Sequence, residues 1–190
     1  MSTVPRRLAL ANGWWGMTAF VATEAAVFGS LLASYFFLRS KAPAWPPDGI
    51  DPPKLLLPLV LTGVLVATSL PMHLASSLAL RDRVGSARLA LLLALVTQVG
   101  YLAVQARLYT EDLAKFTPQE SAYGSIYYTL VGAHHAHVFL GILLTLWLVL
   151  RLLTGLTRYR VTAVQAIAFY WHFVNALAVA VLLTQISPSL

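Results

Sequence analysis

The chain has 190 residues, of which 58% are hydrophobic and 11% are charged, and its mean hydropathy is +0.73. A soluble domain carries about 25% charged residues, so this composition indicates an integral membrane protein. The net charge of +6 then fits basic loops at an anionic membrane surface better than nucleic-acid binding. The lack of cysteine excludes disulfides, iron–sulfur clusters, thiolate catalysis and copper sites that need a thiolate.

Five apolar runs are each long enough to cross a bilayer, which takes about 20 residues. We therefore predict an all-α fold, in which residues 1–190 form one domain, an integral membrane bundle of five transmembrane helices. The expected helices cover 14–38, 56–80, 87–108, 122–151 and 162–185.

The first run follows Arg6 and Arg7, as a signal peptide would. It is about 25 residues long, however, whereas the apolar region of a signal peptide has about 7–15, and it contains Glu24. We expect a retained helix. In the second run, Pro58 and Pro71 should bend the helix, since proline removes a backbone hydrogen bond.

The loops differ in charge, and this difference predicts the orientation. The N-terminal tail, the second loop and the fourth loop, counted with the adjoining helix ends, hold eight Lys and Arg residues, whereas the first loop, the third loop and the C-terminal tail, counted in the same way, hold five. Because basic residues are retained on the inner side, the N-terminus is expected in the cytoplasm and the C-terminus outside.

One carboxylate lies in the middle of the first expected helix. An ionised acid at this depth costs about 2.5–3.5 kcal/mol on insertion scales, so Glu24 must be neutral, paired, or in a hydrated cavity. Two interpretations remain open: a proton-carrying site, or a buried carboxylate that is hydrogen-bonded to another helix.

Histidines are the other polar residues within the spans. His134 and His137 share a helix face with Gly141, while His135 points about 100° away. At 1.5 Å per residue, Glu24, His137 and His172 all lie about 17–20 Å below the outer surface. We therefore expect a polar cluster of Glu24, His134, His137 and His172, in which Glu24 bonds to His137 or His134 before His172.

Two other classes of function use the same residues. A bis-histidine haem or a histidine-rich metal site could pair His134 or His137 with His172, although histidines in membranes also serve as hydrogen-bonding groups between helices. A proton-coupled transporter could be built around Glu24, but the sequence lacks the internal repeats that many transporters have.

WWGMTAFVATEAAVFGSLLASYFFLR, YGSIYYTLVGAHHAHVFLGI and AFYWHFVN are three motifs of the chain, and together they resemble subunit III of the haem–copper terminal oxidases. WWGMTAFVATEAAVFGSLLASYFFLR resembles the family's W-[WF]-G-M helix, and Glu24 occupies the place of its intramembrane glutamate. YGSIYYTLVGAHHAHVFLGI resembles a helix that ends in G-F-H-G-L-H-V-x-x-G, with Gly132, His134, His137 and Gly141 matching. AFYWHFVN resembles W-Y-W-H-F-V-D, with Trp171 and His172 matching.

This resemblance implies a five-helix, multi-pass subunit in the cytoplasmic (inner) membrane of a bacterium, without catalytic or metal-binding residues of its own. Haem and copper are expected in partner subunits: subunit I in direct contact, and subunit II. Such a subunit supports the assembly, stability and proton uptake of an oxidase that reduces oxygen to water, with cytochrome c as donor, and can bind phospholipid. Gly132, Gly141 and Trp171 are then expected to pack helices together. A ubiquinol oxidase and the accessory subunit of nitric-oxide reductase are the alternatives within this group.

The chain also departs from the family pattern. Longer members have two further helices at the start, which border a lipid-holding cleft. Asn175 stands where aspartate is usual, Gln165 where glutamate is usual, and Leu108 replaces a glutamate before Tyr109. The chain has therefore lost several carboxylates while keeping Glu24.

Overall fold

The structure is a computed structural model, which describes residues 12–47, 49–50 and 55–189. The helices are α1 (Asn12–Lys41), α2 (Leu56–Ala67), α3 (Ser69–Leu80), α4 (Val84–Leu113), α5 (Ala122–Arg151) and α6 (Arg158–Ile186), with short 3-10 turns η1 (Leu152–Thr154) and η2 (Ser187–Ser189). Five helical stretches in the described residues are long and apolar enough to span a membrane, with α2 and α3 together forming one of them. This confirms the predicted all-α architecture.

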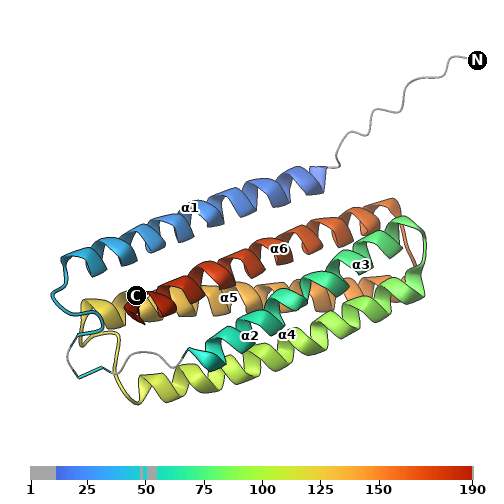
Figure 1. The fold of residues 1–190 in the computed structure, drawn as a ribbon. Coiled ribbons are helices and arrows are strands. Elements are labelled where there is room, and N and C mark those ends of the chain that lie inside the picture. The colour runs from blue at the N-terminus through green and yellow to red at the C-terminus, as the bar shows by residue number, and fades with distance from the viewer. Residues whose placement is uncertain (1–11, 48, 51–54, 190) are drawn as a thin grey trace, which may run out of the picture.

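The helices form a four-helix ring with a fifth helix packed on its outside (Figure 1). In the ring, α3 packs on α4, α4 on α5, α5 on α6, and α6 on α3, while α1 contacts α5 and α6. The end of α6 lies at the same end of the bundle as the α4–α5 loop, and we call this the C-terminal end. The α3–α4 and α5–α6 loops lie at the opposite, N-terminal end.

Helices α1, α4 and α6 are longer than the apolar runs that predicted them, whereas the second span and α5 have the predicted bounds. Helix α4 was expected over 87–108 and covers Val84–Leu113, because polar residues at its end continue the helix and Arg107 bridges to Glu111 at 2.9 Å. An apolar run gives the length of the membrane span, not of the helix. The start of α5 coincides with the prediction, and there the Ser121 hydroxyl accepts a hydrogen bond from the Gly124 amide at 3.0 Å.

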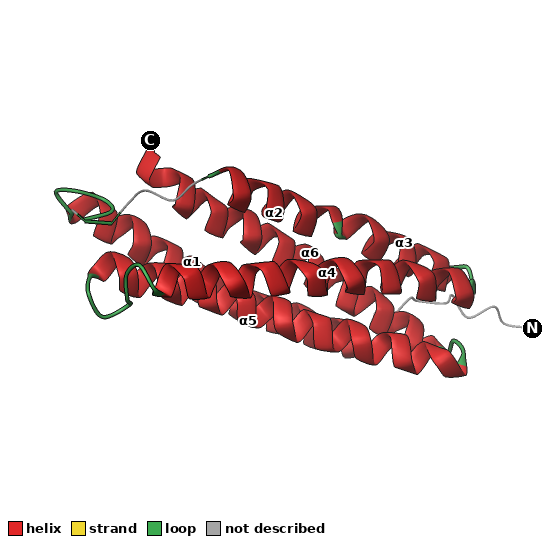
Figure 2. Ribbon diagram, turned by 90° about the horizontal axis from the view of Figure 1, so that it is seen from below, coloured by secondary structure: helices red, strands yellow, loops and turns green. Residues whose placement is uncertain are grey.

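The second span is interrupted at Thr68, where Figure 2 shows a turn between α2 and α3. Pro71 has no N–H to donate to the carbonyl of Ala67 four residues before it, so the regular helical pattern cannot continue through this point. Beside the break, the Thr68 hydroxyl donates to the Leu65 carbonyl at 2.6 Å. A bend near Pro71 was expected, and the break lies three residues before it.

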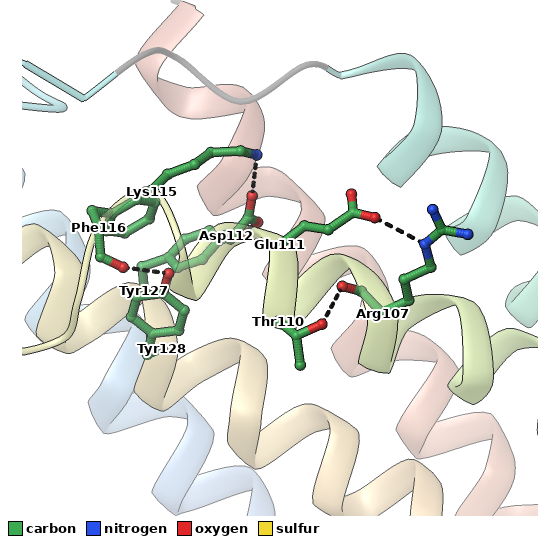
Figure 3. A network of polar contacts seen from close by, with 8 residues as sticks. All are labelled: Arg107, Thr110, Glu111, Asp112, Lys115, Phe116, Tyr127 and Tyr128. Carbon is green, nitrogen blue, oxygen red and sulfur yellow. Dashed lines mark hydrogen bonds and ion pairs between the residues drawn. The ribbon is translucent and has the colours of Figure 1, made fainter.

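Aromatic and acidic side chains join α4 to α5 at the C-terminal end (Figure 3). The Tyr127 hydroxyl donates to Asp112 at 2.9 Å, and Asp112 also pairs with Lys115 at 2.7 Å. The Tyr128 hydroxyl donates to the carbonyl of Phe116 at 2.9 Å, and the Phe116 ring lies against the rings of both tyrosines. These contacts fix the loop that positions the start of α5.

Candidate functional site

The intramembrane carboxylate pairs with one histidine. Glu24 Oε2 on α1 lies 2.8 Å from Nε2 of His137 on α5. The two side chains are 21% and 17% exposed, so the pair lies at the edge of the bundle, partly covered by protein. Phe28, one turn after Glu24, packs edge-on against the His137 ring. The hydroxyl of Tyr170 on α6 donates to the His137 carbonyl at 3.0 Å. Three helices therefore meet at His137.

The second ring nitrogen of His137 determines how many protons the pair holds. Its Nδ1 lies 2.7 Å from the carbonyl of Ala133, which can only accept, so Nδ1 carries a proton. The Nε2–Glu24 contact needs one further proton between the two groups. Whether this proton is on the carboxyl or on the imidazole, the pair as a whole is neutral. A neutral pair avoids most of the cost that an isolated charge has inside a membrane.

His134 has different neighbours from His137, although the two are three residues apart. It is 3% exposed and points toward α4, where the Tyr101 hydroxyl lies 3.4 Å from its Nε2. Gln105 donates to the same hydroxyl at 3.0 Å, which leaves Tyr101 free to donate to His134. His134 thus joins α4 to α5, while His137 joins α1 to α5.

His172 lies away from Glu24, on the outer face of α6. It is exposed, and its ring centroid is 6.4 Å from that of His73 on α3, which is exposed as well. The structure therefore brings Glu24 and His137 together, whereas His134 and His172 each have other partners. His135 packs its ring against Tyr109 of α4.

Gly141 and Trp171 form a close contact between α5 and α6. A Cβ atom added to Gly141 would lie 2.7 Å from Cζ2 of Trp171, so only glycine leaves room for the indole. Trp171 is fully buried, and its Nε1 donates to the Thr145 hydroxyl at 2.7 Å. Gly132 has a related but looser role, because a Cβ atom there would lie 3.3 Å from the Tyr109 hydroxyl.

Replacing Trp171 with phenylalanine should lower the stability of the bundle by about 1–3 kcal/mol, because the Thr145 hydroxyl loses its indole donor and the smaller ring leaves a cavity. The midpoint of thermal unfolding in mild detergent measures this loss. The Thr145→Val variant tests the same hydrogen bond from the other side, because it removes the acceptor, and it should lower the midpoint as well. An unchanged midpoint in both variants would contradict the role given to this contact.

A hydrogen-bonded contact between α1 and α6 was missed in the sequence. The buried hydroxyl of Tyr35 contacts the Thr184 carbonyl at 2.5 Å and the Ser187 hydroxyl at 2.8 Å, and accepts a hydrogen bond from Trp45 at 2.9 Å. Sequence spacing gives no sign of this contact, because Tyr35 lies among other aromatic residues and its partners are 149 and 152 residues away.

The geometry does not favour a bis-histidine haem. Nε2 of His137 is occupied by Glu24, His134 is directed at α4, and His172 is on the exposed face of α6 beside His73. Within the described ranges, no three His, Asp or Glu side chains are close enough to share a metal ion. What the arrangement supplies is hydrogen bonding between helices.

Comparison with known proteins gives one consistent family. Residues 7–186 match the family described as Cytochrome c oxidase subunit III. A relative from Synechocystis sp., named Cytochrome c oxidase subunit 3, is 31% identical over 163 residues, which are 85% of this chain and 69% of that one. Relatives of the same name from Thermostichus vulcanus and Homo sapiens are 27% and 30% identical over 85% of this chain. The matches span 80% of the former and 64% of the latter, so the chain covers less than two thirds of the human protein's length.

Proposed function

Because the chain belongs to the cytochrome c oxidase subunit III family, we propose that it is a non-catalytic subunit of a haem–copper terminal oxidase. In this proposal the oxidase lies in the inner membrane of a bacterium and reduces oxygen to water with electrons from cytochrome c. Haem and copper reside in the partner subunits, with subunit I in direct contact and subunit II alongside. This chain supports the assembly, stability and proton uptake of the catalytic subunit.

The Glu24–His137 contact is the observation that best supports a structural role. Glu24 and His137 form an ionisable pair that joins α1 to α5 through a 2.8 Å contact and is neutral overall. His137 has no free ring nitrogen left for a cofactor, since its Nδ1 is bonded to the carbonyl of Ala133. Side chains of this kind hold helices together in a membrane, where apolar side chains gain little by leaving lipid.

The face that carries His73 and His172 is our candidate for the contact with a partner subunit. Both histidines are exposed although they belong to membrane-spanning helices. Ionisable side chains are costly when they face lipid. In membrane-spanning helices they therefore usually face a protein interior or water. A neighbouring membrane subunit that offers hydrogen-bonding groups would remove this cost.

The charges at the ends of the bundle support the orientation expected from the sequence. Arg81, Arg83 and Arg88 lie at the N-terminal end, together with Arg158 and Arg160. The C-terminal end has fewer basic residues, namely Arg39, Lys41, Arg107 and Lys115. We propose that the N-terminal end faces the cytoplasm, in accordance with the positive-inside rule.

Purification of the tagged chain in mild detergent tests the proposal. We expect a larger haem-containing subunit and a copper-containing subunit to accompany it in equal amounts. A dicopper subunit among the accompanying chains identifies cytochrome c as donor, whereas a subunit II without copper identifies a quinol oxidase. Recovery of the chain without any haem-containing partner would overturn the proposal.

The double variant His73→Leu and His172→Leu should weaken the association with the haem-containing chain, because it removes the polar groups of the proposed contact face. The ratio of haem to tagged chain after purification measures this effect, with Leu74→Ala and Val179→Ala as the control on exposed residues of the same helices. An unchanged ratio in the histidine variant would place the partner on another face.

A further inference from the structure

Gln98 is buried in the four-helix ring without a hydrogen-bond partner. It has no exposed surface, and neither its Oε1 nor its Nε2 is bonded to any of the described residues. It lies on the inner face of α4 with Leu91, Ala94 and Tyr101, which are spaced three or four residues apart and are all buried. An amide buried without any hydrogen bond is costly, and buried polar groups in proteins are nearly always bonded to another protein group or to ordered water.

The break between α2 and α3 lies at nearly the same level. Helices α3 and α4 are antiparallel neighbours joined by a short turn after Leu80, so the thirteenth residue before that turn, Thr68, is level with the thirteenth after it, Val96. Gln98 lies two residues further along α4, about 3 Å along the helix axis from this level. Because of Pro71, the carbonyl of Ala67 lacks its usual donor at this level.

Asn175 brings a further unpaired polar atom to this level from α6. Its Nδ2 donates to the Ser69 hydroxyl at 2.7 Å, which fixes its height beside the break. Its Oδ1 is buried and unbonded among the described residues. Helices α4 and α6 lie across the ring from each other, with α3 between them on one side and α5 on the other.

We propose that the centre of the ring holds bound water at the level of the α2–α3 break. The water hydrogen-bonds to the Gln98 amide and to the Asn175 carbonyl oxygen. A water molecule typically makes about three such bonds in a buried site. Neither amide reaches the other directly, whereas a molecule that both donates and accepts can satisfy them together.

The site adjoins a chain of polar groups that reaches the surface of the bundle. One turn beyond Gln98, Tyr101 contacts His134, and Tyr101 also accepts from Gln105. Gln105 is half-buried. Water would reach the centre of the four-helix ring along these three polar side chains, which lie where α4 contacts α5.

A density map of the purified protein at about 2 Å resolution, which shows ordered water directly, tests the proposal. We expect density for at least one water within hydrogen-bond distance of the Gln98 amide. A map in which the amide is bonded only to protein groups, or in which no water density accompanies it, overturns the proposal.

The Gln98→Met variant gives an independent result, since methionine has a similar shape and cannot bind water in this way. If the site is hydrated, the variant should lower the midpoint of thermal unfolding by at least about 2 °C. If no water is bound to the Gln98 amide, the variant removes a polar group that has no hydrogen bond. The midpoint would then be unchanged or higher, which would contradict the proposal. Leu102→Met, half-buried on the same helix, is the control for introducing a thioether.

Discussion

Replacing Gly141 with leucine is expected to prevent α5 and α6 from packing against each other. Even a single Cβ atom at this position would lie 2.7 Å from the Trp171 ring. The indole cannot move away easily, because it is fully buried and bonded to Thr145 at 2.7 Å. Overpacking of this kind costs about 1–3 kcal/mol for small additions, so Gly141→Ala should be destabilised measurably and Gly141→Leu should not accumulate as folded protein.

Gly100 provides the matched control, because it is also a helical glycine but is exposed on α4 with nothing within 4 Å of an added Cβ atom. Gly100→Ala should be neutral or stabilising by up to about 1 kcal/mol, since glycine is a poor helix former. The yield of monodisperse protein in detergent and the thermal midpoint are the measurements. Equal effects of alanine at positions 141 and 100 would show that the Gly141–Trp171 contact is unimportant.

The second large effect is expected for His137→Leu, which leaves Glu24 without its partner in the membrane. The lost hydrogen bond itself is worth about 0.6–1.7 kcal/mol in membrane proteins. The stranded carboxylate adds a larger cost, up to about 2.5–3.5 kcal/mol at the centre of a bilayer. The variant should therefore lose α1 from its position on α5, which limited proteolysis and the thermal midpoint both detect.

The same argument predicts an asymmetry between the two partners. Glu24→Leu should be less harmful than His137→Leu, because a neutral imidazole with Nδ1 bonded to Ala133 is cheaper to leave unpaired than a carboxylate. Glu24→Gln should behave almost as the unchanged protein, since the amide can still bond to Nε2 of His137. If the double variant Glu24→Leu and His137→Leu were as unstable as the sum of the single variants, the two residues would not act as a pair.

Hydropathy predicted the fold well because apolar runs of bilayer length have few alternatives to helices. The five spans follow from such runs, and the Ser121 cap makes the start of α5 coincide with the end of the polar loop. The break at Thr68 was harder to place, because proline shows that a helix must be perturbed nearby but does not fix the residue at which it is interrupted.

The polar residues were predicted less completely because depth does not specify direction. Glu24, His137 and His172 were expected at similar heights, yet His172 is on the outer face of α6 beside His73. His134 and His137 are three residues apart on α5, and this small angular difference is enough to direct one toward α4 and the other toward α1. Which neighbouring helix each side chain meets depends on the order of helices around the ring, and the sequence pattern contains no direct information about that order.

Metal and haem analysis of the separated chain tests the central claim most directly. The tagged complex is first purified, this chain is then released from it by stronger detergent, and both fractions are examined by optical spectroscopy and by iron and copper analysis. We predict that haem and copper remain entirely with the partner subunits, and that the released chain has neither a Soret band nor bound copper. Stoichiometric haem or copper in the released chain would contradict the conclusion that Glu24 and the histidines serve to join helices.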